Sequence, residues 1–163
     1  MKKKIKLFQK ISLINQRYKK NELYHYFDCP DVSIVIPLIN KKFLLVSQRR
    51  EPINKVNYEF PSGWVDKGEA ASESAARELF EETGYKSLNN PKKLLNFFEE
   101  PGRMNSKAIC FYTKKLIKIN KPEKEIKIHL CTKKEIFKLI KKDKFNNASH
   151  IAAFYFFLFS IKI

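Results

Sequence analysis

Three glutamates stand close together in one short stretch of the chain and could bind metal ions. Glu78, Glu81 and Glu82 lie in residues 72–83, SESAARELFEET, whose apolar residues recur at helical spacing. On a helix, side chains three and four positions apart are neighbours, so the three carboxylates would project from one face. Like charges at this spacing destabilise a helix, and Arg77, four residues before Glu81, relieves only part of that repulsion.

A concentrated anionic face becomes favourable when hard divalent cations bind to it. Mg²⁺ prefers oxygen ligands and is usually shared between one or two carboxylates and substrate phosphates. Adjacent glutamates also occur on solvated helix faces, and Glu81–Glu82 alone would fit that interpretation. The fixed offsets that separate Gly63, Glu69 and Gly84 from these glutamates favour metal binding instead. The segment therefore predicts a platform for a phosphate-bound metal.

Residues 63–85 resemble a complete Nudix box, G-x5-E-x7-R-E-U-x-E-E-x-G-U, in which U is a bulky apolar residue. Every specified position is met, with Tyr85 a slightly unusual final U. The resemblance implies an α+β protein with the Nudix fold, an α/β/α sandwich in which a mixed sheet lies between helices. It also implies that Glu78 and Glu82 are the main metal ligands and that Glu81 shares the metal cluster.

Other residues of the box would support these ligands. The resemblance implies that Glu69 and Arg77 orient the ligands, as such partners commonly do, and that the main-chain oxygen of Ser62 joins the metal site. The implied cofactor is Mg²⁺ or Mn²⁺. Cations spread over a diphosphate lower its negative charge density, activate water and stabilise the leaving phosphate. We expect attack at phosphorus on a nucleoside diphosphate linked to another moiety, releasing a nucleoside monophosphate and the phosphorylated partner.

Passages outside the box resemble the ADP-ribose and nucleoside-diphosphate-sugar pyrophosphatases of the Nudix family. They are residues 46–50 (VSQRR), 58–63 (YEFPSG), 100–102 (EPG), 123–128 (EKEIKI), 133–137 (KKEIF) and 147–153 (NASHIAA). The resemblance implies that Arg50 contacts substrate phosphate or nucleotide, that Glu59 assists this contact, and that Pro101 shapes the sugar pocket. Arg50 could also be a surface charge after a strand, and Pro101-Gly102 an ordinary turn.

The chain departs from that subgroup at two places. Relatives often carry a glutamate a few residues beyond the Pro-Gly pair, where this chain has RMNSK at 103–107. A further catalytic glutamate, which relatives place on a later loop, would fall at Glu123 or Glu125, and we favour Glu123 slightly. Either glutamate could instead be a solvated charge in a lysine-rich loop. The departures leave ADP-ribose open as the substrate but not the type of reaction.

Three other functions fit parts of the sequence. The first is a different Nudix specificity, for GDP-mannose-like sugars, dinucleoside polyphosphates or nucleoside triphosphates. The second is a non-catalytic domain that senses a nucleotide, although such domains tend to have a degraded box. The third is action on RNA 5′ ends, which depends only on the positive charge of the chain. We expect ADP-ribose or a related nucleotide sugar.

The elements that would position these residues follow from hydrophobic periodicity and turn residues. We expect strands at 5–14, 23–27, 32–39, 43–46, 58–60, 94–98, 108–113 and 126–131, and helices at 72–83, 133–141 and 148–160. Polar residues 15–21 would form the first turn and 40–42 a hairpin. Ser72 and Thr132 are expected N-caps, and Gly84 is an expected helix stop.

The length of 163 residues suits one ordinary domain with a substantial core. We expect residues 31–163 to form the Nudix hydrolase domain and residues 1–30 to form a small N-terminal antiparallel β segment. In relatives of the subgroup the N-terminal strands support a homodimer. The same assembly is expected here.

Composition indicates a globular protein of the cytoplasm. No run reaches the roughly 18 apolar residues of a membrane span, and the nearest, residues 151–163, is expected to be a buried helix. The basic residues 1–6 are not followed by an apolar run, so no signal peptide is expected. Cys29, Cys110 and Cys131 lie far apart without a CxxC pair, which argues against a disulfide framework or a zinc site.

The formal net charge of +16 is high, but the lysines are scattered along the chain rather than gathered on one element. Abundant Lys, Asn, Ile and Phe are also typical of an AT-rich genome. A positive field draws polyanionic substrates toward a protein whatever its fold. We therefore expect a small nucleoside-diphosphate partner and no dedicated nucleic-acid surface.

Overall fold

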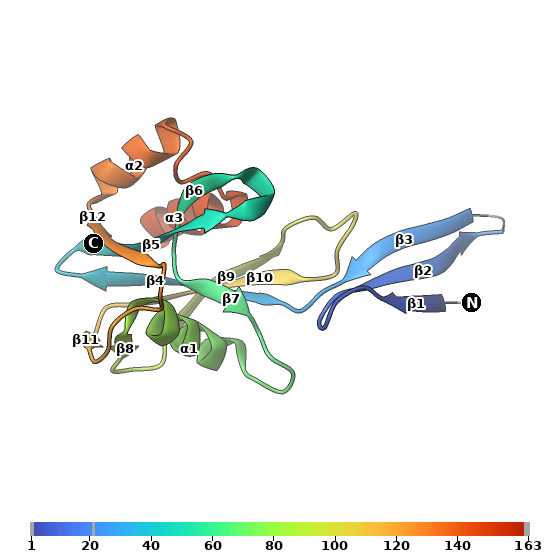
Figure 1. Cartoon of the computed structure of the whole chain (residues 1–163), viewed down its shortest axis with the longest axis horizontal. Coiled ribbons are helices and arrows are strands. Elements are labelled where there is room, and N and C mark those ends of the chain that lie inside the picture. Colours follow the sequence, from blue (N-terminus) through green and yellow to red (C-terminus); the bar gives the residue numbers. More distant parts are fainter. Residues whose placement is uncertain (1, 21, 162–163) are drawn as a thin grey trace.

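The computed structural model describes residues 2–20 and 22–161 and consists of a layered body with a sheet that extends from it (Figure 1). In chain order the elements are β1 (Lys2–Lys6), β2 (Ser12–Lys19), β3 (Glu22–Asp28), β4 (Val32–Ile39), β5 (Lys42–Arg50), the 3-10 helix η1 (Glu51–Ile53), β6 (Lys55–Glu59), β7 (Ser62–Trp64), α1 (Ala71–Thr83), β8 (Tyr85–Ser87), β9 (Lys92–Phe98), β10 (Lys107–Thr113), β11 (Leu116–Lys118), β12 (Lys127–Cys131), α2 (Lys133–Lys141) and α3 (Ala148–Ser160).

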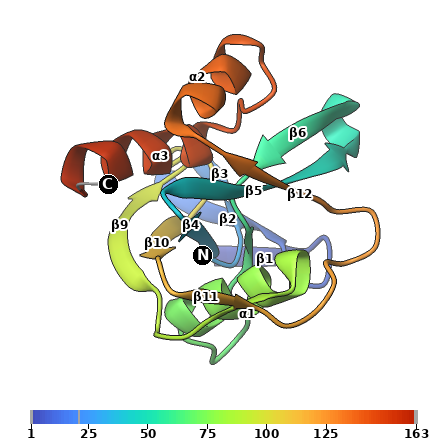
Figure 2. The same ribbon diagram turned by 90° about the vertical axis from the view of Figure 1, so that its left-hand side faces the viewer.

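The body contains a seven-stranded mixed sheet in the order β12-β5-β4-β10-β9, with β6 paired to β5 and β7 paired to β4. Strand β10 runs parallel to β4, and the other pairs are antiparallel. Helix α1 lies on one side of the sheet, and α2 and α3 lie on the other (Figure 2). The α+β sandwich expected from the sequence is confirmed.

Central strand β4 is buried on both faces, as its largely apolar sequence requires. Because side chains alternate along a strand, Ile34 and Ile36 point to the larger core, on the side of α2 and α3. Val35 points the other way and packs with Ala75 and Leu79 of α1. This contact fixes the apolar side of α1 against the sheet and leaves its glutamate side for other contacts.

The larger core is built from aromatic side chains. Phe43 packs edge-on against Phe154 and Phe157, with ring centroids 5.2 and 5.7 Å apart, and Phe60 packs edge-on against Phe145. Such arrangements place the positive edge of one ring on the negative face of another. Helix α3 is nevertheless buried on one side only, since Phe159 is 91% exposed. Among the described residues, no helix is long and apolar enough to cross a membrane.

Several expected boundaries agree with the structure to the residue. Strand β4 and helices α2 and α3 have the expected bounds, and Thr132 caps α2 by accepting the Glu135 N–H. The β4–β5 hairpin turns through Asn40 and Lys41, both at positive φ (49° and 64°), which suits a tight turn between twisted strands. Gly84 ends α1 in the left-handed conformation, with φ of 68°.

The expected N-terminal pair of strands is wrong, because the structure has three. The loop after β1 closes with a hydrogen bond from Leu7 N–H to Ile11 O, and the polar residues expected to form a turn continue β2 instead, from Asn15 to Lys19. Their backbone groups pair with β3, and the exposed position of this sheet lets polar side chains face water. Residue 21 of the expected turn lies outside the described residues.

The expected N-cap of α1 is also wrong. The helix begins at Ala71, and Ala70 is the capping residue in place of Ser72. The Glu73 carboxylate accepts the Ala70 N–H at 3.1 Å, so a glutamate inside the first turn satisfies the free backbone donor. Strands β7, β8 and β11, each three residues long, were not expected because so short a segment carries no periodicity. The division into domains at residue 30 stays a prediction.

Candidate active site

The glutamate side of α1 faces the short strand β7. An ideal Cβ at Gly63 would lie 2.2 Å from Glu78 Oε1, so the Glu78 carboxylate occupies the space above this glycine. Strand β7 is held by pairing with β4, where Gly63 lies opposite Ser33. The fold therefore brings the first residue of the box against a carboxylate fifteen positions later, and a side chain at position 63 would displace that carboxylate.

Arg77 joins three carboxylates. Its Nε and Nη2 donate to the two oxygens of Glu69 at 2.9 and 3.1 Å. Its Nη1 donates to Glu78 Oε1 at 2.6 Å and to Glu81 Oε2 at 3.1 Å. The hydrogen bonds to Glu69 raise the pKa of Arg77 above its usual range although burial opposes them, so the guanidinium stays charged. Charge-assisted contacts of this kind fix carboxylate orientation.

Glu82 is the most buried acid of the helix, at 7% exposure. Burial raises the pKa of its carboxyl to about 8, although a hydrogen bond from the Ser62 N–H at 3.1 Å favours the charged form. The structure thus places the amide of Ser62 on Glu82. A role for the Ser62 carbonyl oxygen as a metal ligand stays a prediction.

Burial also raises the pKa of Glu78, and the charges of Glu81 and Glu123 add to the rise while Arg77 opposes it. Glu123 reaches this position because its N–H donates to the main-chain oxygen of Glu81 at 3.1 Å. The loop that carries Glu123 therefore lies against the end of α1. This placement favours Glu123 over Glu125 as the glutamate that a substrate at the acidic face would meet.

The acidic face fits a hard divalent cation by its chemistry. Its donors are carboxylate oxygens, which Mg²⁺ and Mn²⁺ prefer, and a cation would offset the charge that burial leaves unfavourable on Glu78 and Glu82. Within residues 2–20 and 22–161, no group of three Asp, Glu, His or Cys side chains is arranged closely enough to hold a metal ion. Arg77 holds Glu78 and Glu81 in the arrangement that the structure describes.

A second charged pair lies beside the acidic face. Arg50 donates to both oxygens of Glu59, through Nε at 3.1 Å and through Nη2, and Asn57 Nδ2 donates to Glu59 at 2.9 Å. Burial opposes ionisation of Glu59, but the hydrogen bonds from Arg50 prevail and hold the pKa of this carboxyl below its usual range. Arg50 and Glu59 both influence Glu82, so this pair borders the acidic site.

A cavity of about 400 Å³ is lined by residues of β7 and of the start of α3. Arg50, Ser62, Gly63 and His150 are among its lining residues. A substrate held at the acidic face could extend into this cavity and reach Arg50. The cavity adjoins the acidic face through Gly63, beside which the Glu78 carboxylate lies, although no residue of α1 is among its described lining residues.

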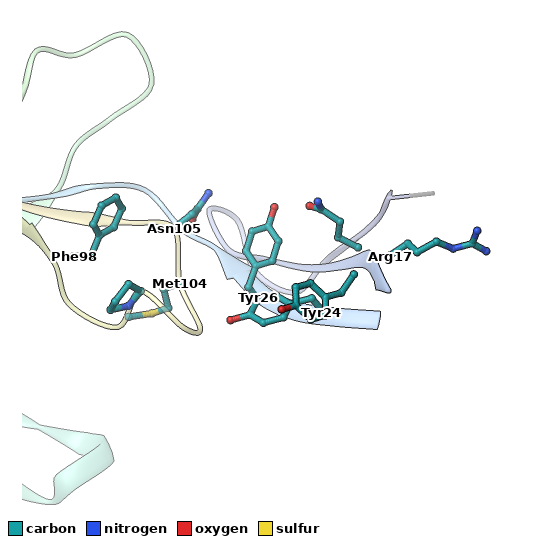
Figure 3. Close-up of a pocket in the computed structure, with 9 residues that line it drawn as sticks. Arg17, Tyr24, Tyr26, Phe98, Met104 and Asn105 are labelled. Carbon is teal, nitrogen blue, oxygen red and sulfur yellow. The ribbon is translucent and has the colours of Figure 1, made fainter. Parts of the chain in front are cut away.

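Pro101 lies elsewhere. It lines a separate cavity of about 450 Å³ between the N-terminal sheet and the loop after β9, together with Tyr24, Tyr26, Phe98 and Met104 (Figure 3). The structure therefore brings together every site residue expected from the sequence except Pro101. Its expected contact with the substrate sugar stays a prediction.

Sequence reasoning missed two residues at the cavity edge. His150 is 2% exposed and lines the cavity, and Asn57 holds Glu59. The spacing of Asn57 and Glu59 was a usable signal, because residues two apart on a strand share a face. His150 gave a weaker signal, since it is a single histidine in an apolar helix.

Fold and site together define a layered α+β protein in which one helix carries the acidic centre. The model of the NUDIX domain matches residues 29–154. The chain therefore belongs to the Nudix family.

Two relatives and one solved structure are similar to it. A methanol dehydrogenase activator from Bacillus methanolicus is 36% identical, and an ADP-ribose pyrophosphatase from Bacillus subtilis is 32% identical, each over 93 residues. Each alignment covers 56% of this chain and 48% of the relative, so the chain aligns with about half the length of these curated relatives. The crystal structure of an ADP compounds hydrolase has a TM-score of 0.78 at 17% identity, covering 96% of this chain and 89% of that one. At this identity the likeness concerns the fold.

Replacing Gly63 with alanine tests the packing of the acidic face. The new Cβ would displace the Glu78 carboxylate, and all its closest neighbours belong to that side chain. We expect Mn²⁺ affinity, measured by titration calorimetry, to fall about tenfold to a hundredfold, as when a ligand loses its support. Gly68→Ala is the matched control, because a Cβ there meets nothing within 4 Å and only the positive φ of 85° is strained. Equal Mn²⁺ affinities of the two variants would contradict this geometry.

The raised pKa of Glu82 predicts how stability depends on pH. Because the folded carboxyl titrates near pH 8 and the unfolded one near its ordinary value, the folded state binds the extra proton between them. The free energy of unfolding of the metal-free protein should therefore fall as pH rises through that window. Glu82→Gln should remove this loss and raise the melting temperature above pH 8, by about 3 °C per kcal/mol regained.

Melting of both proteins from pH 5 to pH 9 in EDTA measures this effect. Glu81→Gln is the control, since that side chain is 42% exposed. A melting temperature of Glu82→Gln that follows the wild type at every pH would show that Glu82 is not the group responsible.

Proposed function

We propose that the chain is a metal-dependent Nudix pyrophosphohydrolase. Its substrate is a nucleoside diphosphate linked to another moiety, with ADP-ribose or a related nucleotide sugar as the preferred class. The observation that carries the proposal is the carboxylate face of α1, held by Arg77 above Gly63 and opening into the cavity that Arg50 lines. The names of the Bacillus subtilis relative and of the solved structure support the choice of ADP compounds.

The residues of the acidic face have different roles, which depend on their positions. Glu78 and Glu82 are the main ligands for Mg²⁺ or Mn²⁺, and Glu81 completes the acidic group. When bound, a divalent cation lowers the charge on the diphosphate oxygens and activates water. Glu69 fixes Arg77, which in turn orients Glu78 and Glu81, so the ligands keep their geometry.

Substrate binding and proton transfer fall to residues around this centre. Arg50, oriented by Glu59, faces the cavity and would contact phosphate oxygens. Glu123 lies beside the end of α1, from which its carboxylate can accept a proton from the attacking water. The products are a nucleoside monophosphate and a sugar phosphate.

Hydrolysis assays with Mg²⁺ test the proposal. We expect ADP-ribose to give AMP and ribose 5-phosphate, in preference to GDP-mannose, a diadenosine polyphosphate, ATP and triphosphorylated RNA. Glu78→Gln and Glu82→Gln should each lower kcat/KM by about a hundredfold or more, because each removes the negative charge of a proposed metal ligand and replaces one carboxylate oxygen with NH2. Glu73→Gln is the matched control on the same helix, where the carboxylate only caps Ala70.

The outcomes separate the proposal from its rivals. A preference for a triphosphate over every nucleotide sugar would contradict the substrate class. A wild type that binds nucleotides but turns over no diphosphate would indicate a sensor. Comparison of Glu123→Gln with Glu125→Gln assigns the proton acceptor, with the larger loss of kcat expected at Glu123.

We also propose that the protein is a homodimer whose contact involves the N-terminal sheet. Strands β1–β3 extend from the body in Figure 1 and expose several large apolar side chains: Ile5, Leu7, Phe8, Tyr18, Leu23, Tyr24 and Phe27. A three-stranded sheet usually needs a covered apolar face to be stable. We further propose a cytoplasmic location. The thiols of Cys29, Cys110 and Cys131 are free, as is usual in a reducing compartment.

Sedimentation velocity measures the assembly. The wild type should sediment at about twice the chain mass of 19.3 kDa. The double variant Tyr18→Lys, Leu23→Lys should shift toward the monomer, because it adds charge to the proposed contact. Ile53→Lys, at a similarly exposed apolar position on the body, should remain dimeric. A monomeric wild type at micromolar concentration would refute the assembly.

A further inference from the structure

The cavity beside the acidic face has one wall that the proposed mechanism does not use. This wall is the first turn of α3, from which Asn147, Ser149 and His150 line the cavity. The cavity is also lined by Ser62 and Gly63, next to the acidic centre, and by Glu99. A ligand that spans the acidic face and Arg50 would therefore pass directly along the start of α3.

His150 is held in one orientation by its surroundings. Its Nδ1 accepts the Phe60 N–H at 3.0 Å, and its ring stacks on the Phe60 ring at an interplanar angle of 14°. An imidazole nitrogen that accepts a hydrogen bond carries no proton, so the proton of the neutral ring is on Nε2. Burial lowers the pKa of His150 to about 4, which keeps the ring neutral under ordinary conditions.

Within residues 2–20 and 22–161, the hydrogen bond found for the His150 ring involves Nδ1, and Nε2 is not among the fully buried side-chain atoms that lack a partner. The Nε2–H donor therefore reaches the surface of the cavity that His150 lines. Asn147 Oδ1 already accepts the Ser149 N–H and hydroxyl, and Arg50 carries donors only. Glu99 and Ser149 also line the cavity, and neither is found bonded to His150 among the described residues. The cavity is the space from which an acceptor can reach His150.

We propose that His150 is a substrate-binding residue. Its Nε2–H donates a hydrogen bond to an oxygen in the part of the substrate that lies between Arg50 and the acidic face. The acceptor is a phosphate or sugar oxygen of a nucleoside diphosphate. The proposal deepens the proposed function and rests on it.

Replacing His150 with asparagine removes the Nε2–H donor and keeps an acceptor near the position of Nδ1. In His150→Asn the amide oxygen can replace Nδ1 as the acceptor for the Phe60 N–H, but no group remains at Nε2. We expect KM for ADP-ribose to rise about tenfold, the loss of one net hydrogen bond, with kcat within about twofold. The dissociation constant of the non-hydrolysable α,β-methylene analogue of ADP-ribose, measured by titration calorimetry with Mg²⁺, should rise equally.

Two further variants complete the experiment. His150→Gln places an amide donor toward the Nε2 position and should recover part of the lost affinity. His129→Asn is the matched control, because its ring bonds Ser47 on the far side of β5 and does not line the cavity. It should leave KM and analogue binding unchanged.

The readouts distinguish this inference from the proposed function. A lower melting temperature of His150→Asn with unchanged KM and analogue affinity would make His150 a core residue and overturn the inference alone. Failure of the wild type to bind the analogue would overturn it as well. Analogue binding that depends on His150 in a wild type without any hydrolysis would support the inference and refute the enzymatic function.

Discussion

Arg77 contacts Glu69, Glu78 and Glu81 at once, and the other parts of the acidic site depend on this contact. Without it, the carboxylates of one helix face would repel one another and turn toward water, where they would bind a cation only weakly. Glu69 holds the guanidinium through two parallel hydrogen bonds, which fix its plane as well as its position. The loop between β7 and α1 is therefore as much a part of the site as the helix.

The fold supplies the second constraint, which is close approach. Val35 of β4 packs against Ala75 and Leu79, so α1 can neither roll nor move away from the sheet. Gly63, on the strand next to β4, then meets the Glu78 carboxylate at a distance that excludes any side chain. Burial of Glu82 follows from the same packing and explains its raised pKa. Core and site are thus held by opposite sides of one helix.

The spacing of the glutamates predicted the acidic helix because i, i+3 and i, i+4 neighbours depend only on helical geometry. The Arg50–Glu59 contact could be expected only from the family resemblance, since its two residues lie on separate strands whose register no local pattern reveals. His150 was missed because its importance comes from Phe60, ninety positions away in the chain. The third N-terminal strand was missed because residues 5–14 were expected to form one strand, whereas a loop between Leu7 and Ile11 divides them between β1 and β2. The polar residues 15–19 were expected to form a turn but continue β2.

The acidic site has a charge opposite to that of the protein as a whole. A net charge of +16 attracts polyanions from every direction, yet the face that would receive a diphosphate carries the glutamates 78, 81 and 82. The general field can bring a diphosphate to the surface but cannot hold it against these carboxylates. Glu78, Glu81 and Glu82 would need to hold a divalent cation for that local repulsion to become an attraction. In the proposed function, the lysines would therefore influence the rate of encounter, whereas the acidic helix with its metal would decide where the diphosphate is held.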